Sequence, residues 1–265
     1  GGVGFNARVR MQGESRDNNA GVMGLNGARF GVTYGGLLVN VGNIIGAVEN
    51  APGLYTTGTR SAGTGIDGMG FNSLPIIGAS WDAYSSAGVG ANGVEALYTV
   101  GGFTGHISFS QQNETFAANN NGGEERAAIM LTYSFGDYYV TGAYQSSTGG
   151  PTSSNATGAE ELNDGLYFVA AGADWGQFGA KLAYGSTAAT DAVTLEGNMD
   201  IGAASNILVW VNNASTNNLT TRGPAATRTT IGRDGTSWGI NYQYDLGGGS
   251  TFVAGYVDSE RGVNA

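Results

Sequence analysis

The sequence predicts an all-β protein that forms an antiparallel up-and-down barrel and crosses a membrane with its strands. Apolar and polar residues alternate with period two along almost the whole chain, which is typical of strands with two unlike faces. Tight glycine turns alternate with long polar connections, as in a meander of hairpins. The apolar faces carry no charge at mid-strand, as contact with lipid requires.

The composition excludes several classes of function. The 265 residues include no cysteine and one histidine, His106, so thiolate metal sites, disulfide frameworks and clusters of several histidines are ruled out. There are 21 acidic and 11 basic residues, and the cations are scattered, so we expect no binding to nucleic acid. The longest apolar run, 166–173, is too short for a membrane-spanning helix.

Strand-type alternation recurs in segments distributed along the whole chain. The predicted strands are 5–11, 28–34, 37–43, 94–100, 103–110, 127–135, 138–145, 165–174, 178–185, 192–201, 206–212, 238–246 and 251–257. The face that each residue occupies is clear in all of them except 165–174 and 206–212. We therefore expect residues 1–265 to form a single β-barrel domain.

The connections between these strands fall into two sets that alternate. Glycine-containing tight turns are predicted at 35–36, 101–102, 136–137, 176–177, 202–203 and 247–249. Long polar connections are predicted at 12–27, 44–93, 113–125, 146–164, 186–191 and 213–236. A barrel with short turns at one rim and long loops at the other is typical of strands that cross a membrane.

The width of the barrel decides which face meets water. Thirteen or more strands enclose a lumen too wide for side chains to fill, so the polar face must line water and the apolar face must meet lipid. The charged residues on the polar face are Arg8, Arg10, Arg29, Glu95, Lys181 and Glu196. Aromatic residues gather near strand ends, as in the girdles at the two membrane surfaces.

Segment 44–93 is far longer than an ordinary connection between strands. It contains packing groups such as Leu54, Leu74, Ile76 and Trp81, so it can fold against another part of the protein. Because the barrel encloses an open lumen, we expect the segment to fold inward.

Three stretches carry a resemblance to a known family: Phe-Asn-Ala-Arg-Val-Arg-Met-Gln at 5–12, Leu-Val-Asn-Val-Gly-Asn at 38–43, and Tyr-Gln-Tyr-Asp-Leu-Gly-Gly-Gly at 242–249. With the position of the long segment, they resemble the general porins of alphaproteobacteria, which are sixteen-stranded trimeric diffusion channels. The resemblance implies residence in the outer membrane of a Gram-negative bacterium, contact with its lipid and lipopolysaccharide, and a homotrimer. It also implies that two strands are missing before Gly1 and one after Ala265.

In that family, a loop folded into the barrel narrows the pore and sets carboxylates against basic residues of the wall. By this resemblance, segment 44–93 is the constriction loop. Its predicted acidic side comprises Glu49, Asp67 and Asp82, with Glu95 on the following strand, and the basic wall comprises Arg8, Arg10 and Arg29. Lys181, Glu196 and His106 are predicted to line the lumen elsewhere. Opposed charges across such a gap create a transverse field that favours polar solutes.

The resulting expectation is a channel for passive diffusion of small hydrophilic solutes and ions, with a weak preference for cations and no enzymatic activity. No cofactor is expected. Two acidic loop clusters leave binding of Ca²⁺ as an open alternative: Glu14, Asp17 and Asn18 in one loop, and Glu160, Glu161 and Asp164 in another. The alternative function is that of an extracellular or surface β-rich binding or adhesion protein. A requirement for detergent separates the two readings.

Overall fold

The computed structural model describes residues 2–16, 19–25, 27–55, 74–76, 79, 81–83, 92–111, 125–148, 165–187, 190–216 and 234–259. In this part of the chain, no helix has the length and apolar character needed to cross a membrane. Thirteen strands pair as antiparallel neighbours in one sheet of order β1-β4-β5-β6-β7-β8-β9-β10-β11-β12-β13-β14-β15.

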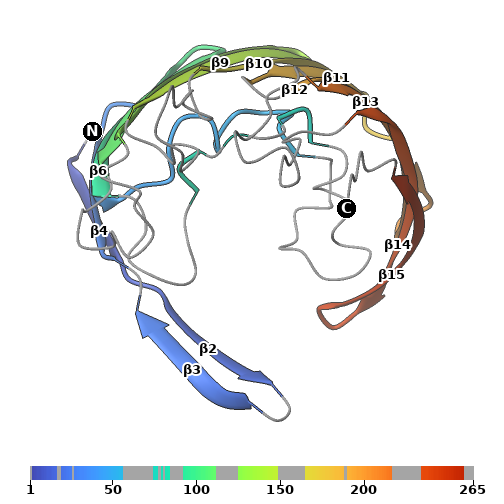
Figure 1. Ribbon diagram of the computed structural model, residues 1–265, viewed down its shortest axis with the longest axis horizontal. Helices are drawn as coiled ribbons and strands as arrows, with labels where there is room; N and C mark the ends of the chain where they lie inside the picture. Colours follow the sequence, from blue (N-terminus) through green and yellow to red (C-terminus); the bar gives the residue numbers. More distant parts are fainter. Residues whose placement is uncertain are drawn as a thin grey trace, which may run out of the picture.

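The strands of this sheet are β1 (Gly4–Arg8), β4 (Arg29–Tyr34), β5 (Leu37–Asn43), β6 (Asn92–Val100), β7 (Phe103–Gln111), β8 (Glu125–Phe135), β9 (Tyr138–Thr148), β10 (Leu166–Asp174), β11 (Phe178–Ser186), β12 (Thr190–Ile201), β13 (Ser205–Thr216), β14 (Gly235–Gly247) and β15 (Ser250–Ser259). Figure 1 shows that the sheet curves into an open ring. Residues 44–55, 74–76, 79 and 81–83 lie inside that ring (Figure 1). The predicted all-β meander is therefore confirmed.

The segment after β1 differs from the prediction. The sequence predicts one strand over 5–11 followed by a polar connection, whereas β1 ends at Arg8 and a separate hairpin follows. This hairpin pairs β2 (Met11–Arg16) with β3 (Asn19–Leu25) and projects away from the ring (Figure 1). Apolar and polar residues do not alternate regularly in Met-Gln-Gly-Glu-Ser-Arg of β2 or in Asn-Ala-Gly-Val-Met-Gly-Leu of β3, so the pattern does not indicate these strands.

Strand ends at the tight turns were predicted well, and several of those at the long connections were predicted too short. The turn glycines adopt positive φ, for example 53° at Gly35 and 87° at Gly36, as short hairpin turns require. At the opposite rim, pairing continues beyond the apolar segments, for example between Thr190 and Thr216. There the residues on both faces are polar, so pairing persists where the alternation does not.

The two faces of the sheet have the inverted polarity that the sequence predicts. Large apolar side chains are exposed on the outer face, including Ile129, Leu131, Leu182 and Leu195. The inner face buries polar residues in successive strands, including Asn40, Glu95, His106, Ser108, Thr132, Thr141, Gln145, Lys181, Thr194, Glu196, Asn212 and Asn241. A soluble protein buries its apolar side and exposes its polar side, so this sheet is built for apolar surroundings.

Candidate functional site: the inner wall and its inward segment

The inward segment begins directly after β5. Asn43 ends that strand, and residues 44–50 leave the sheet and form a turn. Gly46 has a φ of 84°, and a Cβ at this position would lie 2.7 Å from the backbone oxygen of Asp82. The segment thus brings its first turn against its own later part, 81–83, with no room for a side chain between them.

Apolar residues of the segment pack on the inner wall. Val48, Leu54, Leu74 and Ile76 are buried in one cluster. The wall contributes side chains from neighbouring strands to the same cluster: Met130, Ala143, Leu166, Phe168, Ala170 and Ala183. This contact resolves the unclear alternation of 165–174, because β10 exposes apolar residues on its outer face and buries apolar residues under the segment on its inner face.

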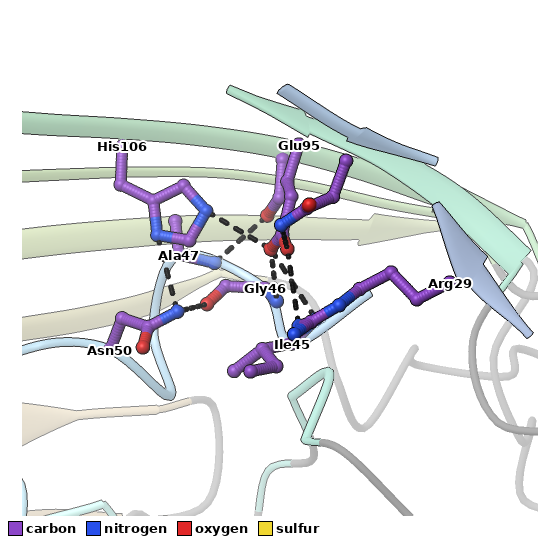
Figure 2. Close-up of polar contacts among 9 residues, drawn as sticks. Arg29, Ile45, Gly46, Ala47, Asn50, Glu95 and His106 are labelled. Carbon is purple, nitrogen blue, oxygen red and sulfur yellow. Dashed lines mark hydrogen bonds and ion pairs between the residues drawn. The ribbon is translucent and has the colours of Figure 1, made fainter. Parts of the chain in front are cut away.

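Glu95 of β6 lies at the centre of the polar contacts that fix the start of the segment (Figure 2). Its Oε2 accepts hydrogen bonds from the backbone N–H groups of Ile45 and Gly46, at 3.3 and 3.1 Å. Its Oε1 accepts one from Asn40 Nδ2 at 2.6 Å. The backbone donors satisfied in this way belong to residues that have left the sheet and lack strand partners.

Two basic groups complete the surroundings of this carboxylate (Figure 2). Nε2 of His106, on β7, lies 3.2 Å from Oε2, and Nη1 of Arg29, on β4, lies 3.7 Å from Oε1. On the same strand as His106, the Ser108 hydroxyl oxygen accepts a hydrogen bond from the Ala47 N–H at 3.0 Å. Three consecutive backbone amides of the segment, from Ile45 to Ala47, are therefore bound by wall side chains.

A second set of contacts lies farther around the wall. Lys181 Nζ of β11 donates to the Tyr55 carbonyl oxygen at 2.5 Å and pairs with Glu196 of β12 at 2.7 Å. Arg126 of β8 donates through Nη1 to Asp82 Oδ1 at 2.9 Å. Ion pairs at such buried positions hold their partners in place, because separating them leaves a charge without compensation.

Glu49 is engaged within the segment itself. Its Oε2 accepts hydrogen bonds from the Tyr55 hydroxyl at 2.6 Å and from the Trp81 indole N–H at 2.8 Å. The carboxylate thus links the early part of the segment to its return path. Of the four predicted acidic residues, Glu49, Asp82 and Glu95 lie on the inner side of the sheet, and Asp67 lies outside the described residues.

The predicted basic wall is placed in part. Arg8 and Arg29 are direct neighbours in the register of β1 and β4. Arg29 reaches Glu95, whereas Arg10 lies beyond the end of β1 and is exposed. Lys181, Glu196 and His106 point inward but are almost fully buried. Whether these residues act on permeating solutes stays a prediction.

Several residues of this wall were not singled out in the sequence, among them Arg126, Asn40 and Asn212. Arg126 lies just before the predicted start of its strand, and Asn40 and Asn212 occupy ordinary polar positions. Their parity could have placed them on the inner face, but only the path of the segment gives them partners. Asn212 Nδ2, for example, donates to the Leu74 carbonyl oxygen at 3.3 Å.

Of the residues named for Ca²⁺, Asp17, Asn18, Glu160, Glu161 and Asp164 lie outside the described residues. Glu14 belongs to β2. Binding of Ca²⁺ therefore stays a prediction.

The fold and this inner wall define a class: a membrane-spanning β-barrel with apolar outside, polar inside and a long segment packed on its inner face. The family model described as Gram-negative porin matches residues 1–263, and the chain belongs to this family. A curated relative from Fuscovulum blasticum, named porin, is 27% identical over 205 residues. That alignment covers 76% of this chain and 66% of the relative, just under two thirds of its length.

Solved structures show the same fold. Two engineered variants of the Rhodopseudomonas blastica porin match with TM-scores of 0.70 and 0.69, each at 21% identity. Both alignments cover 98% of this chain and 80% of the matched chain. The family and its relatives place the protein in the outer membrane of a Gram-negative bacterium.

Proposed function

We propose that the protein forms a water-filled channel through which small hydrophilic solutes and ions cross the outer membrane by passive diffusion. The observation that carries this proposal is the inverted polarity of the sheet, with large apolar residues exposed outside and polar residues on the inner wall. When the apolar outer face of such a wide sheet meets lipid, its polar inner face encloses water. The proposal assigns the protein no enzymatic activity.

We propose further that the channel prefers cations weakly. The formal net charge of −10 raises the local cation concentration near the protein surface, and salt screens this effect beyond about 8–10 Å. On the inner wall the described carboxylates lie beside cations or hydrogen-bond donors, and Arg8 and Arg29 offset their charge. A modest preference that weakens as salt rises follows from this balance.

Reversal potentials in asymmetric KCl across planar bilayers test both statements. We expect discrete conductance steps, a small cation preference at low salt, and a shift toward anions when Glu49, Asp67 and Asp82 are all replaced by amides. Glu125→Gln is a matched control, because Glu125 bonds Gln111 at an exposed position on the edge of the long connections.

Three results would overturn these proposals. Absence of conductance from folded protein would refute the channel. Anion preference of the unmodified protein at low salt would refute the assigned selectivity. A protein that stays monodisperse without detergent would favour the binding or adhesion function instead, since its exposed apolar face would then have no lipid to cover it.

We also propose a homotrimer in contact with outer-membrane lipid and lipopolysaccharide, in line with the trimeric channels that the sequence resembles. The mass of the protein in detergent, corrected for bound detergent, measures the number of chains. A mass of one chain in mild detergent at high protein concentration would contradict the trimer.

A further inference from the structure

The start of the inward segment depends on one buried carboxylate of the wall. Glu95 is 3% exposed, and its two oxygens contact the N–H groups of Ile45 and Gly46, the Asn40 amide, His106 and, at 3.7 Å, Arg29 (Figure 2). A carboxylate that contributes to ion selectivity must face the solution in the pore. This carboxylate instead faces the backbone of the segment.

The contacts of His106 extend this arrangement to the next turn. Asn50 Nδ2 donates to the Gly46 carbonyl oxygen at 3.2 Å and lies 3.4 Å from His106 Nδ1. The His106 ring therefore lies between Asn50 and Glu95, with Nδ1 beside the amide and Nε2 3.2 Å from Glu95 Oε2. His106 is 1% exposed, so it links the turn at 47–50 to Glu95 out of contact with bulk water.

The position of Gly46 also affects the return path of the segment. A Cβ on Gly46 would lie 2.7 Å from both the Cβ and the backbone oxygen of Asp82. The Asp82 side chain in turn is bound by Arg126. Any displacement of Gly46 is therefore transmitted to residues 81–83 on the opposite side of this contact.

We propose that Glu95 is a positioning residue, which with His106 fixes the root of segment 44–93 on the wall and so keeps the channel at one steady width. The Glu95 carboxylate accepts hydrogen bonds from backbone amides of the segment, and its charge contributes little to ion selectivity. This inference rests on the proposed channel function, and it assigns to Glu95 a role different from that of an ion-facing carboxylate.

Single-channel recording of Glu95→Gln tests the proposal against the wild-type protein and the Glu125→Gln control. The Gln side chain replaces one acceptor oxygen with an NH₂ donor, so it cannot accept all of these bonds. We expect transient partial closures to become at least about tenfold more frequent, as loss of a charge-assisted hydrogen bond implies. The reversal potential of the main open level should remain that of the wild type.

A disulfide provides the rescue. The Ala47 N–H donates to the Ser108 hydroxyl at 3.0 Å, so a cysteine at each of these two positions tests whether a cross-link between the turn and the wall replaces the lost bonds. The chain has no cysteine of its own, so Ala47→Cys and Ser108→Cys pair without competition. In the Glu95→Gln background, oxidation of this pair should restore steady openings, and reduction should bring the closures back.

Several outcomes would overturn the proposal. One is a changed reversal potential with steady openings in Glu95→Gln; another is no change at all; a third is failure of the oxidised disulfide to suppress the closures. If Glu95→Gln does not fold, hydrogen exchange in wild-type peptides covering 44–50 decides, since rapid exchange of the Ile45 and Gly46 amides would refute their bonds to Glu95. If the wild-type protein does not conduct, the proposed function fails, whereas the exchange measurement still reports on Glu95.

Discussion

The apolar outer face predicts a large cost for a charge at the middle of a strand. Leu131 of β8 is 61% exposed and belongs to the outer parity. From Glu125 to Phe135 the strand rises about 24 Å along the membrane normal, at ~3.4 Å per residue and ~45° tilt, and Leu131 lies about 2–3 Å from its middle. Arginine at that depth costs roughly 2–4 kcal/mol, so we expect Leu131→Arg to lower the free energy of unfolding by this amount.

Leu246 supplies the matched control. It is 62% exposed and lies one residue before the end of β14, at the rim of the tight turns. Leu246→Arg places the same charge near the membrane surface, where its cost is about 0–1 kcal/mol. Reversible unfolding from lipid vesicles in urea, followed by tryptophan fluorescence, measures both variants. Equal costs for the two, or no cost at Leu131, would refute the assignment of this face to lipid.

Two further predictions concern an ion pair of the inner wall and the packing of the inward segment on that wall. Lys181→Ala should destabilise the protein by about 3–5 kcal/mol, because Glu196 loses its partner in a buried ion pair. The double variant Lys181→Met with Glu196→Gln should cost less stability. Urea unfolding of the wild type and these two variants checks both statements. Gly53→Ala should cost roughly 2–4 kcal/mol and alter single-channel conductance, since Gly53 has a φ of 87° and a Cβ there would lie 2.7 Å from the Ala170 Cβ. An unchanged unfolding midpoint in Gly53→Ala would contradict the packing of this segment on β10.

The strands and their faces could be predicted because the signal is local. Residues two positions apart on a strand lie on the same face. Alternation alone therefore assigns Leu131 to the lipid side and Thr132 to the interior. The signal fails where both faces are apolar, as in β10, whose inner residues Leu166 and Phe168 are covered by the inward segment. It also fails where apolar and polar residues do not alternate regularly, as in the hairpin of β2 and β3.

The candidate site could be predicted only as a set of residues on one side of the sheet. Parity places Glu95 on the inner face, but it does not show that the carboxylate binds the backbone of the segment rather than facing the lumen. The Asp82–Arg126 contact joins residues 44 positions apart, and its formation depends on the path of the segment across the wall. Side-chain pairing of this kind is determined by tertiary structure, for which periodicity carries no information.

The apolar contacts of the segment contribute more free energy than its polar ones. We therefore expect loss of the Glu95 carboxylate to make the open channel less steady, while the segment stays packed on the wall. Burial of Val48, Leu54, Leu74 and Ile76 stabilises the packed segment by an upper estimate of about 6–12 kcal/mol, at roughly 1.5–3 kcal/mol for each side chain. A hydrogen bond to a charged group contributes only about 1.5–3 kcal/mol. Removal of the Glu95 carboxylate therefore leaves the apolar cluster largely intact and frees the root at residues 45–46. The expected consequence is local motion of the first turn against 81–83, with the rest of the segment still held on the wall.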